Sequence, residues 1–190
     1  MKKVLSVILC LCFLCFMSSC TKKTEYDDKT IAKIETECIE GMGFGFVYKR
    51  IFDFADGKVY DITLADETII NLLKGQYVAD SDYYKEYASL EEYESYINSC
   101  YNTLIEIATF PEEEGKVFLK KIISLGIYTW KESYTTDEII FDGGSENIKI
   151  FFTDGTEKRT HIYFKYPKNY ERILETFKKH FNVGCWNGTN

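Results

Sequence analysis

The chain has 190 residues, of which 23 are Lys or Arg and 30 are Asp or Glu, so its formal charge at pH 7 is −7. Nucleic-acid binding depends mainly on Lys and Arg side chains that neutralise phosphates, so an acidic chain without a basic cluster argues against a DNA or RNA partner. The length fits one domain of ordinary size with a hydrophobic core of its own.

The N-terminus has the order of a secretory signal. Two lysines precede an apolar run of 14 residues at positions 4–17, which is interrupted by one serine. A helix needs about 20 apolar residues to cross a bilayer, so this run fits a cleaved signal better than a membrane span. Next, Met17-Ser18-Ser19-Cys20 resembles the lipobox of bacterial lipoproteins, in which the cysteine receives diacylglycerol. We predict a signal peptide over residues 1–19 and lipidation of Cys20; an ordinary signal with a chance cysteine is the alternative.

The residues after Cys20 predict a tether followed by an acidic domain. Positions 21–30 are polar and charged, so we expect a flexible tether over residues 20–30 and a single domain over 31–190. Without its signal peptide the chain keeps 21 basic and 30 acidic residues, a formal charge of −9. Two acyl chains on one cysteine suffice for stable anchoring. The expected location is the cell membrane or outer membrane, with the domain lipid-anchored on the extracytoplasmic side.

The first part of the domain has the pattern of a β-sheet. Over residues 32–38, small or apolar side chains alternate with charged ones, and this period of two predicts a half-buried strand. A second strand is expected up to Phe54 and a third over 58–64. Between them, Asp56-Gly57 predicts a hairpin turn, because both positions tolerate positive φ.

Three helices are expected next. Asp66 caps a short helix, which a glycine ends. Ser89 and Glu92 form a capping box for a longer helix, whose apolar stripe we expect to continue to Ala108. A third helix follows Pro111, because proline is tolerated in a first turn and the three glutamates after it complement the helix dipole.

The last part of the domain predicts a second run of strands and a final helix over 169–181. Asp154-Gly155 is expected to turn a hairpin. Segregated runs of strands and helices indicate an α+β fold, in which an antiparallel sheet made of two meanders carries its helices on one face. The strands expected in this run are 127–132, 137–141, 148–153 and 156–165.

The C-terminal third resembles a group of small bacterial lipoproteins without an established activity. The pattern covers residues 130–181 and consists of a tryptophan strand, an Asp-Gly turn, a strand with an Asp-Gly hairpin, and a Tyr-Pro-x-Asn-aromatic entry to the last helix. The resemblance implies an envelope lipoprotein, and it provides no activity or site residue to carry over.

No catalytic, metal or cofactor motif stands out. The two histidines, His161 and His180, have no acid or thiol beside them in the sequence, and a surface role is expected for both. Cys38, Cys100 and Cys185 remain once the signal is removed and Cys20 is lipidated. Buried thiols are favoured for these three and a single disulfide is the alternative, and they lack the spacing of a zinc site.

The tyrosines are the least ordinary feature. Several of them surround the capping box and fall outside the apolar stripe of its helix. Exposed rings with acids nearby suit stacking on a sugar or contact with a cationic peptide. We predict a ligand-binding surface formed by Tyr83, Tyr84, Tyr87, Tyr96 and Trp130.

The sequence therefore predicts a non-enzymatic envelope domain. It would reach the membrane through the lipid on Cys20 and bind an envelope protein or a glycan, with no nucleic acid as partner. An envelope enzyme is one alternative, favoured if His161 is buried beside an acid and a cysteine lies in a cleft. A purely structural protein is another, favoured if the tyrosines are packed and no concave site exists.

Overall fold

The computed structural model describes residues 25–26, 29–39, 46–77, 86–138, 140 and 144–184. Seven strands form one sheet in the order β4-β3-β2-β1-β6-β7-β5, and all neighbours are antiparallel except β5 and β7. The predicted α+β fold is confirmed. The strands are β1 (Ile31–Ile39), β2 (Val47–Asp53), β3 (Lys58–Leu64), β4 (Ile105–Thr109), β5 (Ser133–Thr135), β6 (Ser145–Phe152) and β7 (Glu157–Tyr163).

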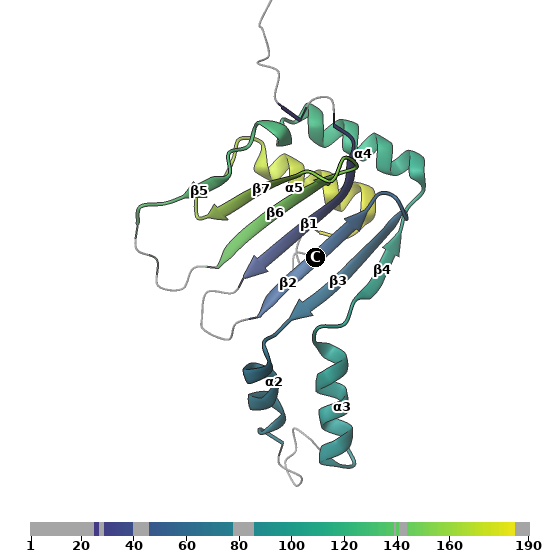
Figure 1. The fold of residues 1–190 in the computed structure, drawn as a ribbon, viewed down its shortest axis with the longest axis vertical. Coiled ribbons are helices and arrows are strands. Elements are labelled where there is room, and N and C mark those ends of the chain that lie inside the picture. Colours follow the sequence, from purple (N-terminus) through teal and green to yellow (C-terminus); the bar gives the residue numbers. More distant parts are fainter. Residues whose placement is uncertain are drawn as a thin grey trace, which may run out of the picture.

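The helices occupy two places relative to this sheet. Two of them, α4 and α5, cover one face, whereas α2 and α3 project beyond one end of the sheet (Figure 1). The other face of the sheet carries no helix among the described residues. The helices are α2 (Glu67–Lys74), α3 (Leu90–Cys100), α4 (Glu112–Ser124) and α5 (Tyr170–Phe181), with a 3-10 turn η1 (Ile127–Thr129) after α4.

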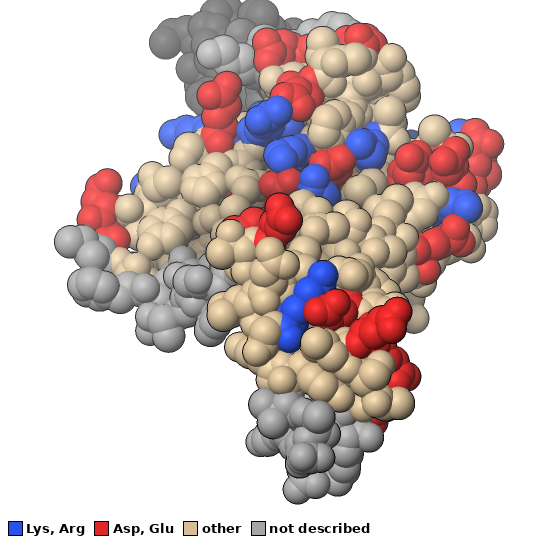
Figure 2. Space-filling view, turned by 60° about the horizontal axis from the view of Figure 1, so that its bottom comes forward, with Lys and Arg blue, Asp and Glu red and all other residues tan. Residues whose placement is uncertain are grey.

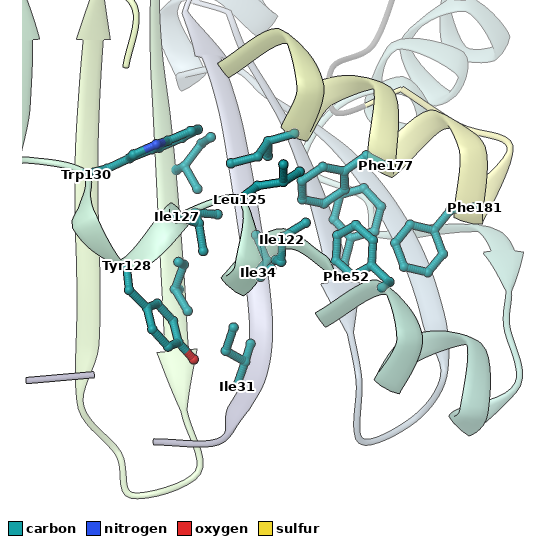
Figure 3. Close-up of a cluster of buried hydrophobic side chains, with 14 of the residues drawn as sticks. Ile31, Ile34, Phe52, Ile122, Leu125, Ile127, Tyr128, Trp130, Phe177 and Phe181 are labelled. Carbon is teal, nitrogen blue, oxygen red and sulfur yellow. The ribbon is translucent and has the colours of Figure 1, made fainter. Parts of the chain in front are cut away.

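The hydrophobic core lies between the sheet and the helices α4 and α5 (Figure 3). Alternation along the strands points Ile34 of β1 and the opposing Phe52 of β2 to this side, where both are fully buried. Phe118 of α4 packs on Phe177 and Phe181 of α5, with ring centroids 4.6 Å apart in both pairs. These rings hold the two helices together over the centre of the sheet.

The predicted hairpins at Asp56-Gly57 and Asp154-Gly155 are confirmed, although only the glycine of each pair has positive φ. Gly57 has φ +64° between β2 and β3, and Gly155 has φ +82° between β6 and β7. Both values lie in the left-handed region that glycine adopts without strain.

The predicted helix through Ala108 is wrong in its second half. Helix α3 ends at Cys100, and β4 then pairs with β3. Asn102 has φ +56°, a conformation that breaks a helix and that asparagine tolerates. The β-branched residues Ile105 and Ile107 favour the strand that follows.

The predicted strand over 127–132 is also corrected. Residues 127–129 form η1, because Gly126 has φ +90° and its carbonyl accepts bonds from the Thr129 amide and hydroxyl. The strand of this region is instead β5, which runs parallel to β7. Within the predicted strand 137–141, residues 137 and 138 form bends, and 139 and 141–143 lie outside the described residues.

Part of the predicted tether is docked on the domain. The Tyr26 ring stacks on Phe152 of β6, with centroids 5.3 Å apart and an interplanar angle of 10°. The Nζ atom of Lys158 lies 5.0 Å from the centre of the same ring. The ammonium group of Lys29 contacts Asp154 in the β6–β7 turn at 3.1 Å. The folded domain therefore includes residues that the sequence assigned to a flexible segment.

Candidate functional site

The projecting helices form an arm, which we define as residues 66–102. It is an insertion between β3 and β4, which are direct antiparallel neighbours in the sheet. Asn102 closes the base of the arm with its side chain. Its Oδ1 atom accepts a hydrogen bond from the main-chain N–H of Ala65 at 3.2 Å, and its Nδ2 atom donates one to the Ala65 carbonyl at 3.0 Å. The Asn102 amide also donates to the Thr63 carbonyl at 2.8 Å.

The arm is held together by its own residues. Local chemistry fixes both helices, since Asp66 accepts a bond from the Ile69 amide and Ser89 one from the Glu92 amide. The main tertiary contacts of α2 and α3 are with each other. Helix α2 has no buried residue, and α3 buries only Tyr93 and Ile97. The arm therefore adds little to the core of the domain.

Two of the predicted site residues meet on the arm. The ring of Tyr87 lies 5.2 Å from that of Tyr96 and 5.2 Å from that of Tyr93. A hydrogen bond with Cys100 and the electrostatic effect of that side chain, followed by the effect of Tyr87, raise the pKa of Tyr96 to about 12. Burial raises the pKa of Tyr87 as well. Both phenols are therefore neutral in the physiological range and can donate hydrogen bonds.

The arm and the strand after it expose apolar side chains. Exposure reaches 58% for Leu72, 47% for Tyr96, 51% for Leu104 and 50% for Ile105. Exposed apolar patches on a folded protein commonly mark interaction surfaces.

The same segment concentrates the negative charge of the chain. Residues 66–102 contain eight acidic and two basic residues, a formal charge of −6 out of −7 for the whole sequence. Figure 2, which looks towards the arm, shows carboxylates beside uncharged surface at this projecting end. Any ligand that docks here meets both an apolar surface and a negative field.

Trp130 does not belong to this surface, which corrects the prediction. It follows η1 and is 3% exposed within the core (Figure 3). Its indole Nε1 donates to the Lys168 carbonyl at 3.1 Å, and its ring lies 6.2 Å from that of Tyr170. Trp130 therefore holds the segment that leads into α5 against the core. The predicted site residues Tyr83 and Tyr84, and Cys20, lie outside the described residues.

A charged network on the open face of the sheet is the main feature that sequence reasoning missed. Glu35 contacts Lys33 at 2.7 Å and Lys49 at 3.2 Å. Glu37 contacts Lys49 at 3.1 Å and Lys149 at 2.7 Å. Burial alone would raise the pKa of both carboxyls, but the lysines outweigh it and hold each pKa below its usual value. The carboxylates in this network are thus largely neutralised by their own neighbours.

His161 joins the network through an amide rather than an acid. Its Nδ1 lies 2.9 Å from Oδ1 of Asn147, whose Nδ2 is 3.4 Å from Glu37. His180 is half-buried against Phe118. Neither arrangement places a base beside a nucleophile, as covalent catalysis requires.

A second polar cluster lies on the helix-bearing face of the sheet, and no local sequence pattern predicts it either. Arg50 forms a two-pronged ion pair with Asp61, at 2.6 and 2.8 Å, and also donates to the Gly184 carbonyl. Nearby along the sheet, Glu146 accepts a bond from the Tyr170 hydroxyl. Burial raises the pKa of Glu146, although the tyrosine bond opposes this effect. These bonds fasten the start of α5 and the residues that follow its end to the strands.

Cys38 and Cys100 are both half-buried and are not joined to each other. Cys185 lies outside the described residues. No helix in the described part of the chain has the length and apolar character to cross a bilayer. Within the same residues, no group of three or more His, Cys, Asp or Glu side chains is arranged to hold a metal ion.

Comparisons of this chain with protein-family models, with curated proteins and with solved structures found no match. The resemblance of residues 130–181 to small bacterial lipoproteins therefore stays a hypothesis.

Proposed function

We propose that this chain is a lipid-anchored extracytoplasmic domain that binds a protein partner with its arm, the lipid being attached to Cys20. The observation that carries the proposal is the position of the arm. Strand β1 starts at Ile31, and its register with β2 and β6 places that end opposite the end from which the arm leaves β3. In Figure 1 the start of β1 and the arm lie at opposite ends of the long axis.

Docking of Tyr26 supports this orientation. If the lipid is on Cys20, only residues 21–24 separate it from the docked segment, a span of at most about 15 Å at about 3.5 Å per residue. The end of the domain that carries Tyr26 and the β6–β7 turn would then face the membrane. The arm would point into the envelope space, where a partner can reach it.

Binding accounts for the surface of the arm better than a structural role does. The aromatic ring of Tyr96 and the side chain of Leu72 are about half exposed, although burying them would stabilise the domain. Tyrosine is also enriched among residues that dominate binding energies at interfaces. A protein is favoured over a glycan, because the exposed surface includes leucine and isoleucine side chains as well as rings.

Metabolic labelling with a fatty-acid analogue tests the anchor. The wild-type chain should carry the label and sediment with membranes, and the Cys20→Ala variant should do neither. Cys100→Ala is the matched control, since it removes another cysteine and should leave the label in place. Equal labelling of Cys20→Ala and wild type would refute the anchor.

A further inference from the structure

The two edges of the sheet are protected very differently. Strand β5 at one edge is three residues long, and its neighbours Lys131 and Glu132 are charged and exposed. Strand β4 at the other edge has the sequence Ile-Glu-Ile-Ala-Thr and contains neither lysine nor proline. Exposed edge strands can pair with other chains, and proteins usually prevent this with short strands, charges or proline. Strand β5 is therefore protected by its short length and by the two charged residues that precede it, whereas β4 is longer and more apolar.

The outer edge of β4 is apolar in character. Ile105 is 50% exposed and Ile107 is 37% exposed. The single charge of the strand, on Glu106, is paired with Lys58 of β3 at 2.8 Å. A β-bulge at Ile107 interrupts the ladder to β3 and increases the local twist, but the bulge leaves Ile105 and Glu106 in regular pairing. In the described part of the chain, β3 is the only strand that pairs with β4.

We propose that β4 accepts an extended segment of a partner protein as an eighth, antiparallel strand, and that this segment is basic. This inference rests on the proposed function and identifies the chemistry of the partner. Strand addition of this kind takes affinity from main-chain hydrogen bonds and specificity from alternate side chains. Leu104 and Ile105 supply the apolar contacts, and they continue directly into the exposed surface of the arm.

The negative charge of the nearby arm favours a basic segment at the edge of β4. A segment that extends along β4 towards the arm approaches described arm residues that include six acidic side chains and one basic side chain, a formal charge of −5. Lysine and arginine side chains on the segment would be attracted there, because oppositely charged surfaces favour encounter and fix register. A second copy of this chain would bring the same acidic arm and the same net negative charge, which disfavours self-association at this edge.

Selection from a phage-displayed library of random peptides tests the inference, with the full chain held in detergent micelles as the target. Enriched peptides should carry net positive charge and alternate apolar residues, and their binding should weaken as salt is raised. Ile105→Lys introduces a natural edge-protecting residue at an exposed position and should weaken binding by about tenfold or more, equivalent to about 1.4 kcal/mol. Ile105→Thr keeps strand propensity without adding charge and should weaken binding by a smaller factor.

Thr135→Lys is the matched control, because it places the same lysine on the opposite edge strand, and it should change binding by less than about twofold. The inference is overturned if no peptide is enriched, if the enriched peptides show no excess of basic residues, or if Ile105→Lys and Thr135→Lys bind equally. A wild-type dimer that Ile105→Lys converts to a monomer would identify a second copy as the occupant and would also overturn it.

The double variant Tyr87→Ala/Tyr96→Ala separates this inference from the proposed function. Some peptides could lose binding to this double variant and still bind Ile105→Lys. That result would support binding by the arm and refute binding at the edge of β4. If peptides bind both variants as tightly as wild type, the proposed binding role of the arm is refuted as well.

Discussion

Replacing Tyr26 with alanine tests whether the N-terminal segment is part of the folded domain. Tyr26 is partly buried; it stacks on Phe152, contacts Tyr128 with centroids 6.0 Å apart, and receives the ammonium group of Lys158. Half of an aromatic side chain is about 100 Å², which contributes about 2.5 kcal/mol on burial, and ring stacking adds about 1 kcal/mol. Ordering the segment offsets part of this gain. We expect Tyr26→Ala to weaken docking by about 2 kcal/mol.

Limited trypsin digestion measures this loss. Lys29 is held against Asp154 and Thr156 while the segment is docked, so cleavage after Lys29 requires the segment to open. A loss of about 2 kcal/mol raises the open population, and with it the cleavage rate, roughly thirtyfold when opening is fast compared with cleavage.

Tyr26→Phe is the control, since it retains the ring and should be cleaved within a few-fold of the wild-type rate. If Tyr26→Ala is cleaved after Lys29 no faster than wild type, the ring does not hold the segment. The tether would then extend to residue 30, as the sequence indicates, and the orientation proposed for the arm would lose its support.

Three further predictions concern stability and are checked by urea unfolding. Asn102→Ala should cost about 2–3 kcal/mol, because it removes two side-chain bonds and leaves alanine at φ +56°, whereas Asn102→Gly should recover the part due to backbone strain. Gly115→Val should cost about 1–3 kcal/mol, since even a Cβ atom at Gly115 would lie 2.9 Å from the Phe110 ring; an unchanged midpoint would contradict this packing. The lowered pKa values of Glu35 and Glu37 mean that their contribution to stability is present above about pH 4.5 and is lost as pH falls through the folded-state values. Glu37→Gln should therefore lose less stability than wild type between pH 6 and pH 3, and equal losses would count against the network.

Local patterns in the sequence predicted much of the fold. The strand β1, the Asp-Gly turns and the helix caps all depend on neighbouring residues, and the structure confirms them. The half-buried character predicted for β1 is wrong, because Glu35 and Glu37 on its second face are only 7% and 8% exposed. The misplaced elements depend on distant partners. Leu104 and Ala108 continue the helical spacing of the stripe of α3, but the conformation of Asn102 ends the helix and pairing with β3 places Ala108 in a strand.

The candidate site was predicted in part, for the same reason. Clustering of tyrosines and acids around Ser89 is visible along the chain, and it led to Tyr87 and Tyr96. Whether an aromatic residue is core or surface depends on the tertiary fold, and Trp130 proved to be core. The charged network was hidden because Lys49 and Lys149 reach Glu37 only through strand register.

The base of the arm is closed by bonds that do not depend on the residues beyond it. The main-chain and side-chain bonds of Asn102 join the ends of β3 and β4 much as a tight hairpin turn would. The sheet therefore sets no limit on the length or composition of whatever lies between Asp66 and Tyr101. A chain of this kind can exchange the arm by recombination or engineering while the sheet and the helices α4 and α5 fold as before.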